Sequence, residues 1–506
     1  MYTVRYDGHV SEIVPKLPDI IADALSNKLC YEPKGAEFSP NHASRKWTMV
    51  NGKRVFNRRA TWDGKIRLFK KGKSNNSFPS GLLVEALTTL APLKLNMNIV
   101  TAPLTPASSN TLDGKQVTLK GKTFTIQLRD YQKEVVQALL EAPFGRAMAE
   151  SPTGSGKSVI IGELCTKFPE LHTLITVPSK SLMYQTSADL EAMLGEPVGR
   201  YGDGVFELHR VTVAIIDSLR EGADTPRATS WLESIKLWVI DESHMSAADS
   251  YQHVSKFLPN TEYRFGVSAT LYREDGAELV FHGLIGPLAI KIDPMRLIND
   301  GHLAKPNIEM HIIEHEKVVN NGRTKPKYDA LYKEQVVNNP DRNDLIFAQA
   351  ERCMLENLTP CLVLIKDLKH GEILQDMLSH LGPTAYLHGE DSQATRERVL
   401  EQFQAGAVPF LVASTIFDVG VDIPEVRSVI LAGAGKSAAR AIQRVGRGLR
   451  KTATKSDVLV IDFEDREPHF LLHHSNERVW WYREYYPGCI TRVRNGIPLR
   501  DLGLGF

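Results

Sequence analysis

A glycine-rich segment with a lysine and three serines, SPTGSGKS at residues 151–158, is the first candidate for chemistry in this 506-residue chain. It follows an apolar segment, RAMAES, and precedes a helical pattern, VIIGELCTKF. In a strand–loop–helix context, backbone N–H groups and a helix N-terminus can surround phosphate oxygens. We therefore predict an ATP site in which Lys157 neutralises phosphate oxygens and Ser158 binds Mg²⁺. The remaining loop residues of this site are Thr153, Gly154, Ser155 and Gly156.

Two adjacent acids end the apolar segment LWVIDESH, residues 237–244. Acids at the carboxyl end of a parallel strand face the ligand crevice of an open α/β sheet. Asp241 is predicted to hold Mg²⁺ through water, and Glu242 to polarise the attacking water. The alternative is a helix N-cap and first turn. A phosphate loop in the same domain favours the catalytic interpretation.

A third candidate, LRDYQKEVV at 128–136, precedes the loop. Tyr131 could stack on a base, and the Gln132 amide could read an adenine edge by donating and accepting hydrogen bonds together. The alternative is a helix start with a core tyrosine.

The elements that must position these residues form two repeated series. Short apolar runs alternate with helical patterns in both halves of the chain, and such alternation is typical of βαβ units with buried parallel strands. We predict an α/β chain in five parts: a small α+β domain (1–105), a linker (106–127), two parallel-sheet domains (128–292 and 293–462) and an aromatic and basic extension (463–506).

The N-terminal part carries a basic segment. From Arg45 to Lys73 there are eleven Lys or Arg residues and one acid, Asp63. Asn51-Gly52 predicts a hairpin, and Asp63-Gly64 a turn before a strand, KIRLF, in which Ile66 and Leu68 pack inward. A local basic field can guide a nucleic acid, although a solvated face is the simpler interpretation. The phosphate-contact candidates here are Lys65, Arg67, Lys70 and Lys71.

The composition of the chain argues against several classes of protein. The net charge of +1 indicates no polyanion partner for the molecule as a whole, and the five scattered cysteines argue against a disulfide framework or structural zinc. The N-terminus lacks a signal-peptide core, and no apolar run is long enough to cross a bilayer. We expect a soluble, cytoplasmic protein without a membrane partner, in the host cytoplasm if it is phage-encoded.

Taken together, the segments resemble the motifs of superfamily 2 helicases and translocases. They occur in that family's order over residues 128–462: Gln132, SPTGSGKS, VPSKSLMYQ (177–185), DESH (241–244), VSAT (267–270), VASTIFDVGVDIP (412–424) and QRVGRGLR (443–450). The resemblance implies two tandem RecA-like motor domains with ATP bound between them.

The resemblance also assigns roles. Ser268 and Thr270 would link hydrolysis to nucleic-acid contact. Arg447 and Arg450 would act on the γ-phosphate, where a guanidinium stabilises charge that develops during transfer. Gln443 and Asp422 would lie near the same cleft. The implied contacts to nucleic-acid phosphates are Ser179, Lys180, Ser414 and Thr415.

The basic N-terminal segment and the domain order resemble the UvsW family of phage branch-migration helicases. This implies ATP-driven, 3′–5′, sequence-independent remodelling of branched or forked DNA, with RNA–DNA hybrids as further substrates, by a monomer. The alternatives are a double-strand DNA translocase that acts on bound proteins or with a nuclease, and an RNA helicase. A decayed motor is disfavoured by the intact Lys157, Glu242, Arg447 and Arg450. The aromatic tail, 478–494, could stack on bases, but packing against the second domain is favoured.

Overall fold

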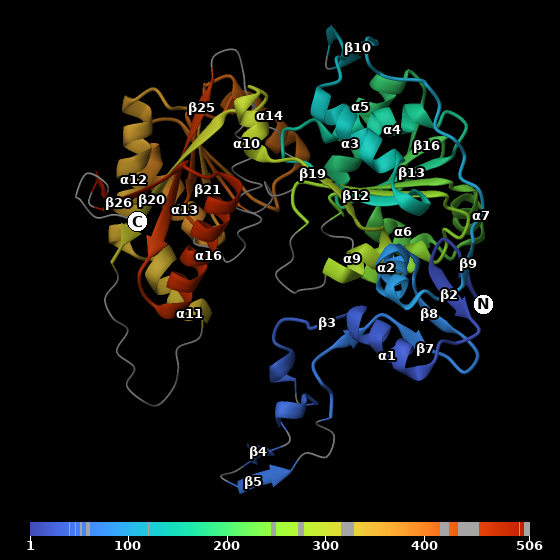
Figure 1. Ribbon diagram of the computed structural model, residues 1–506. Coiled ribbons are helices and arrows are strands. Elements are labelled where there is room, and N and C mark those ends of the chain that lie inside the picture. Colours follow the sequence, from blue (N-terminus) through green and yellow to red (C-terminus); the bar gives the residue numbers. More distant parts are fainter. Residues whose placement is uncertain are drawn as a thin grey trace. The chain divides into compact units, whose positions relative to one another are not determined.

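The computed structural model describes residues 1–39, 41–45, 47–50, 53–56, 61–119, 121–243, 249–271, 278–314, 328–414, 425–433, 455–494 and 496–499. The chain divides into two compact units (Figure 1). One consists of Met1–Ser151 and Gly156–Ile292. The other consists of Asp293–Phe506, with which the short segment Pro152–Ser155 is grouped. The described residues contain no helix that is both long enough and apolar enough to span a membrane.

A five-stranded mixed sheet in the order β7-β8-β2-β1-β9 begins the first unit. Its strands are β1 (Tyr2–Tyr6), β2 (Val10–Val14), β7 (Lys70–Lys71), β8 (Asn76–Pro79) and β9 (Met97–Val100). Only β1 and β9 are parallel. Two helices, α1 (Asp19–Lys28) and α2 (Leu83–Leu90), share the sheet's core through Leu25 and Leu83, which cluster with Val4 and Phe78. This is the small α+β fold that the sequence predicts.

The first unit also contains smaller elements. Three strand pairs are antiparallel: β3 (Cys30–Tyr31) with β6 (Ile66–Arg67), β4 (Trp47–Val50) with β5 (Lys53–Phe56), and β10 (Gln116–Leu119) with β11 (Lys122–Thr125). The second of these is the hairpin predicted around residues 51–52. Short 3-10 turns lie at Ala36–Phe38, Ala43–Arg45, Ser80–Leu82, Ala91–Leu93 and Pro143–Gly145.

The predicted strand at residues 65–69 is not continuous. β6 pairs with β3, whereas β7 pairs with β8, so the chain changes its partner between them. Alternation is therefore lost: Ile66 is 38% exposed, and Phe69 is buried against Phe78 instead. The prediction that Ile66 packs inward is wrong, while Leu68 does contact the core.

The turn before this segment forms as predicted. Gly64 has a φ of +83°, a left-handed conformation that favours glycine. The Asp63 carboxylate accepts a hydrogen bond from the Lys65 amide at 3.2 Å, and the Trp62 indole N–H donates to the Lys65 carbonyl at 2.9 Å. The Asp-Gly pair thus sets the turn, and the side chain of Asp63 reinforces it.

An eight-stranded sheet in the order β15-β14-β16-β13-β17-β18-β12-β19 completes the first unit. All neighbours are parallel except β14 and β15. The strands are β12 (Arg146–Glu150), β13 (Thr173–Val177), β14 (Val198–Gly202), β15 (Val205–Glu207), β16 (Val211–Ile215), β17 (Leu237–Asp241), β18 (Tyr263–Ser268) and β19 (Leu288–Lys291).

Helices cover both faces of this sheet, as the alternating apolar runs predict. The helices α3 (Asp130–Leu140), α4 (Lys157–Lys167) and α5 (Lys180–Leu194) lie on one face, and α6 (Ile216–Gly222) and α9 (Glu278–Leu284) on the other (Figure 1). Two further helices, α7 (Pro226–Ser234) and α8 (Asp249–Ser255), share a buried cluster with α6 and α9 around Trp238.

The second unit contains another eight-stranded sheet, in the order β22-β23-β21-β24-β25-β20-β26-β27. Its strands are β20 (Lys305–Ile313), β21 (Cys361–Leu364), β22 (Thr384–Leu387), β23 (Phe410–Ala413), β24 (Ser428–Leu431), β25 (Asp457–Asp465), β26 (Ile490–Arg494) and β27 (Ile497–Pro498). All neighbours are parallel except β26 and β27. The helices are α10 (Pro294–Asn299), α11 (Tyr328–Tyr332) with a π-helical turn at Lys333–Val337, α12 (Pro340–Leu355), α13 (Leu368–Ser379), α14 (Gln393–Gln404) and α16 (His469–Tyr485).

The aromatic tail belongs to this second sheet. β26 pairs with β20, and α16 packs on β25. Trp481, Tyr482, Tyr485 and Tyr486 are buried, and only Trp480 among the five aromatics is exposed, at 55%. The packing interpretation therefore holds for four of the five rings.

Candidate nucleotide and nucleic-acid sites

The carboxyl ends of three neighbouring strands bring the predicted nucleotide residues to one edge. In the sheet register, Glu150 of β12 faces Ser268 of β18, and Asp241 of β17 faces Val267. Each strand is followed by one of the candidate segments. Because parallel strands end at the same edge, the topology itself gathers the loop, the acids and the Ser268–Thr270 segment.

The phosphate-loop candidate joins β12 to α4. Gly154 and Gly156 have φ values of +84° and +81°, and a Cβ on Gly156 would lie 2.6 Å from Nε2 of Gln132. The conformation thus favours glycine at 156, and a larger residue there would also displace the end of the Gln132 side chain. Since α4 begins at Lys157, the amides of Lys157 and Ser158 precede the first hydrogen bond of the helix and are available to an anion.

Lys157 and Glu242 meet at this edge. Nζ of Lys157 lies 3.2 Å from Oε1 of Glu242, with the side chains 13% and 18% exposed. The Asp241 carboxylate accepts a hydrogen bond from the Glu242 amide at 2.9 Å, and Glu242 has a φ of +52°, which is strained for a side chain of this size. The pair is shielded yet reachable, so an incoming phosphate could replace the carboxylate as the partner of Lys157.

Gln132 and Tyr131 have different surroundings. The Gln132 carboxamide oxygen accepts from the Arg129 amide at 3.0 Å, and its nitrogen lies beside Gly156. Tyr131 is only 1% exposed, and its hydroxyl accepts a hydrogen bond from Arg129 at 2.9 Å. Burial raises the pKa of Tyr131, with Arg129 opposing. Because the ring of Tyr131 lies in the core, the structure favours the second of the two interpretations, a helix start with a core tyrosine.

The Ser268–Thr270 segment is tied to the strand before the phosphate loop. The Ser268 carbonyl accepts from the Ser151 amide at 2.8 Å, and the Ser268 hydroxyl donates to the Thr270 carbonyl at 2.7 Å. The buried Glu150 carboxylate accepts from the Leu271 amide at 3.3 Å. A shift of either segment would therefore be felt by the other.

Two residues at this edge were missed from the sequence. Glu150 ends an apolar strand as Asp241 does, a signal that could have identified it, and it also pairs with Lys291 at 3.3 Å. Arg129 orients both Gln132 and Tyr131, but nothing in the sequence pattern marks it.

Only some of the residues predicted to contact phosphates in the motor sheets lie in the part of the chain that the structure describes. Ser179 caps α5, accepting from the Leu182 amide at 3.4 Å, and Lys180 pairs with Asp203 at 2.6 Å. Ser414 follows β23 and is buried. The predicted residues Thr415, Asp422, Gln443, Arg447 and Arg450 lie outside the described residues.

The four predicted N-terminal contacts differ in their partners. Arg67 pairs with Asp63 at 2.5 Å, and this hydrogen bond is the main reason that the pKa of Asp63 falls to about 2. Lys71 pairs with Asp23. Lys65 and Lys70 are exposed. Arg67 and Lys71 would therefore have to exchange an aspartate for a DNA phosphate, and the contacts of all four residues stay a prediction.

Two family models match the chain. The model described as "Type III restriction enzyme, res subunit" matches residues 125–273, which include Lys157 and Glu242. The model described as "Helicase conserved C-terminal domain" matches residues 326–452. The first model spans seven of the eight strands of the first large sheet, and the second spans four of the eight strands of the second.

Individual relatives agree with these models. The "Putative DNA 3'-5' helicase Rad25" of Haloarcula marismortui is 28% identical over 331 residues, which are 64% of this chain and 51% of that protein. The "ATP-dependent DNA helicase uvsW" of Enterobacteria phage T4 is 22% identical over 348 residues, 66% of this chain and 68% of that protein. The chain thus spans about half the length of the archaeal relative.

A solved structure supports the fold. A variant of S. cerevisiae Dbp5 bound to RNA and ADP BeF3 matches with a TM-score of 0.52 and 18% identity, over 73% of this chain and 90% of that one. The tandem parallel sheets, the edge that carries Lys157 and Glu242, and the two matched helicase models lead to one conclusion: this chain belongs to the superfamily 2 helicases.

Proposed function

We propose that this chain is an ATP-dependent DNA helicase or translocase that moves 3′–5′ and remodels branched DNA. The observation that carries the motor assignment is the approach of Lys157 to Glu242, 3.2 Å apart, at the end of a glycine loop. The direction and the DNA substrate are supported by the names of its relatives, a "DNA 3'-5' helicase" and an "ATP-dependent DNA helicase".

In this proposal the residues of the first sheet divide the work on ATP. Lys157 and the first amides of α4 bind the phosphates, the Gln132 amide binds the adenine edge, and Glu242 accepts a proton from the attacking water. Arg447 and Arg450 would supply positive charge to the γ-phosphate, with Gln443 and Asp422 beside them. Glu150 and Ser268 position the loop through Leu271 and Ser151.

The oxygen donors at this edge fit Mg²⁺. A hydroxyl, from Ser158 in the first turn of α4, and a carboxylate, from Asp241 at the end of β17, are the hard oxygen ligands that this ion takes. Among the described residues no group of three His, Cys, Asp or Glu side chains could form a complete protein cage. That suits Mg²⁺, which keeps several waters and binds substrate phosphates, and when bound would neutralise phosphate charge.

Two substrates remain as alternatives within the same superfamily: duplex DNA tracked without strand separation, and RNA. A comparison of ATP turnover and strand separation on single-stranded, duplex, forked, four-way and RNA–DNA substrates decides between them. We expect the highest turnover and the fastest separation on forked and four-way DNA. Equal rates on plain duplex and four-way junctions would remove the branched-DNA proposal, and turnover stimulated only by RNA would replace it.

A further inference from the structure

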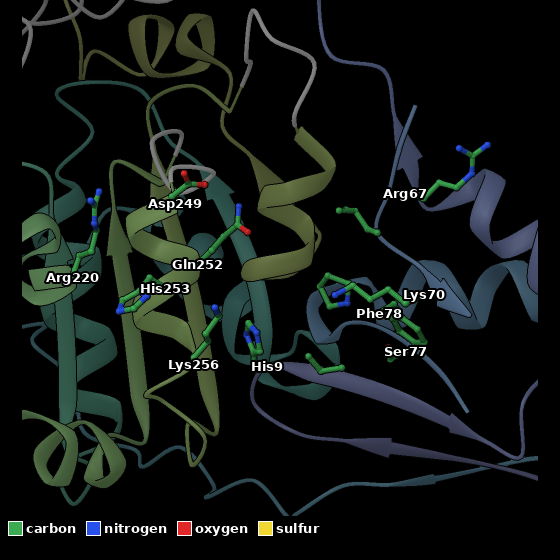
Figure 2. Close-up of a pocket in the computed structure, with 13 residues that line it drawn as sticks. His9, Arg67, Lys70, Ser77, Phe78, Arg220, Asp249, Gln252, His253 and Lys256 are labelled. Atoms are coloured by element: carbon green, nitrogen blue, oxygen red, sulfur yellow. The ribbon is translucent and has the colours of Figure 1, made fainter. Parts of the chain in front are cut away.

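A cavity of about 720 Å³ lies within the first unit, between the N-terminal sheet and the helices of the large sheet. One wall comes from β2, β8 and the segment that includes Lys70, and the other from α6 and α8 (Figure 2). The helix α8 begins eight residues after Asp241, so this wall belongs to the same stretch of chain as the predicted catalytic acids.

Several contacts join the N-terminal domain to the domain of the first large sheet around the cavity. The Ser255 hydroxyl and Nδ1 of His9 are 2.9 Å apart, and Nδ1 of His282 lies 3.2 Å from a carboxylate oxygen of Glu85. Gly8 packs so tightly that a Cβ there would lie 2.9 Å from the Pro259 carbonyl oxygen. Of these contacts, the one between His9, which lines the cavity, and Ser255 of α8 joins the two walls directly.

The cavity is cationic, and three of the four Lys and Arg side chains in its lining are unpaired among the described residues. Lys70, Arg220 and Lys256 come from three different elements, and across the described ranges none of them has an ion-pair or hydrogen-bond partner. The lining contains one carboxylate, that of Asp249, which offsets part of this positive charge. The fourth lining cation, Arg67, is paired with Asp63, and Lys71, next to Lys70 in the chain, is paired with Asp23.

A second sign of positive potential comes from His9, which lines the same cavity. Burial lowers its pKa most, and Arg264, Lys256 and Arg146 lower it further, against Asp7 alone on the opposite side. An anionic ligand would remove this unfavourable field.

We propose that this cavity binds the phosphate backbone of one DNA strand and so makes the N-terminal domain and the first motor sheet share a single strand. This proposal deepens the proposed function and rests on it. A duplex does not fit, because 720 Å³ is the volume of a small-ligand pocket. The lining offers little for base stacking, since the Phe78 ring is buried in the core and the imidazoles of His9 and His253 are half-buried. Recognition is therefore electrostatic and independent of sequence.

The test compares three forms of the full chain that each alter three exposed basic residues. The first, Lys70→Ala/Arg220→Ala/Lys256→Ala, removes the cavity cations. The second, Lys70→Arg/Arg220→Lys/Lys256→Arg, keeps their charge. The third, Lys16→Ala/Lys28→Ala/Lys333→Ala, removes the same charge from exposed lysines outside the cavity. Binding of labelled oligo-dT is measured by anisotropy over a salt series.

The alanine form of the cavity should bind oligo-dT at least about 10-fold more weakly than wild type, with a salt slope smaller by about 2, because each lost single-strand phosphate contact lowers the slope by about 0.7. The charge-keeping form should bind as wild type does, and the outside form should keep the wild-type salt slope. Equal losses in the alanine and outside forms would overturn the cavity as the binding site, and so would a loss in the charge-keeping form. So would poly-glutamate binding that needs the three cations while DNA binding does not, since the occupant would then be an acidic peptide.

The two proposals fail separately. DNA-stimulated ATP turnover of the wild-type chain tests the motor alone, whatever the cavity does. A chain whose turnover rises with DNA, but whose oligo-dT affinity ignores the cavity cations, would keep the motor and lose the cavity.

Discussion

Ion pairs occupy different places in the two large sheets. In the first unit, Lys157 and Glu242 lie beyond the ends of their strands, with side chains 13% and 18% exposed. In the second unit, Arg342 and Asp465 form a pair whose side chains are both 0% exposed. A buried pair that loses one partner leaves an uncompensated charge, whereas a reachable pair can exchange its partner for a ligand. Sheets of similar topology thus use ion pairs for different purposes.

The second unit contains further polar contacts between buried side chains. Arg478 of α16 bonds to the Asp462 carboxylate at 2.8 Å, and Tyr482 donates to the same carboxylate at 2.9 Å. His370 contacts Asn343 at 2.9 Å, also in the core. These groups join α12, α13 and α16 to β25, so polar bonding here is structural.

The largest effect should come from removing Lys157. Lys157→Ala leaves the phosphates without their main cation, and we expect DNA-stimulated ATP turnover to fall at least about 1,000-fold, or about 4 kcal/mol of barrier. Glu242→Gln should have a similar effect on turnover. A steady-state ATP hydrolysis assay measures both.

The control is at the other end of the same helix. Lys167 pairs with Glu163 at 3.2 Å, as Lys157 pairs with Glu242, but lies away from the loop. Lys167→Ala should keep turnover within about threefold of wild type. If Lys157→Ala behaved like this control, the reachable pair would be structural and the comparison would collapse.

The buried pair should respond in stability. Arg342→Met leaves Asp465 charged and enclosed, at a cost of about 3–5 kcal/mol. Hydrogen exchange of the β25 amides reports the loss locally in the full chain. The double change Arg342→Met/Asp465→Leu should recover most of it, and a double variant as unstable as the single one would show that packing, not charge, is responsible.

The sequence predicted the sheets well because continuous apolar runs leave little choice of secondary structure. It predicted the gathering of Lys157, Asp241 and Ser268 because parallel strands end at one edge. The prediction failed where the pairing partner of a strand determines which of its side chains are buried. The chain changes strand partner between Arg67 and Lys70, and the resulting exposure of Ile66 cannot be read from alternation.

Pairing of charges is equally invisible in a sequence. Lys71 meets Asp23 from 48 residues away, and Lys180 meets Asp203. The burial of Tyr131 depends on how α3 packs on the sheet, so the same motif allowed both a ligand and a core interpretation. Long-range contacts, which propensity does not contain, account for each of these differences.

A smaller effect is expected from alanine at Gly156 of the phosphate loop, where the cost of the backbone conformation can be separated from the cost of the steric contact. Gly156→Ala places a Cβ 2.6 Å from Gln132 at a φ of +81°, and Gly114→Ala places one in open space at +82°. Each costs about 1–2 kcal/mol for the left-handed backbone. Only Gly156→Ala should also weaken ATP binding, because Gln132 or the loop must move. Calorimetric unfolding measures the loss of stability, and nucleotide titration measures the affinity for ATP. An equal ATP affinity in both variants would contradict a steric contact between residue 156 and Gln132 that matters for binding.

The last prediction concerns pH in the second unit, where burial, aided by the nearby Arg342, lowers the pKa of His370 to about 3. An unfolded histidine takes up its proton near pH 6.5, whereas the folded one stays neutral down to about 3. The unfolded state therefore binds more protons between these values, and the stability of the fold decreases as pH falls through that window, by up to about 1.4 kcal/mol per pH unit from this group. His370→Gln should remove that component from the pH dependence of β25 exchange, while His473→Gln, at an exposed position, should not. Identical pH profiles for wild type and His370→Gln would mean that the enclosed polar groups of the second sheet can accept charge after all. The buried groups of the second sheet and the Lys157–Glu242 pair of the first would then differ only in their exposure to solvent, and not in their ability to change charge or partner.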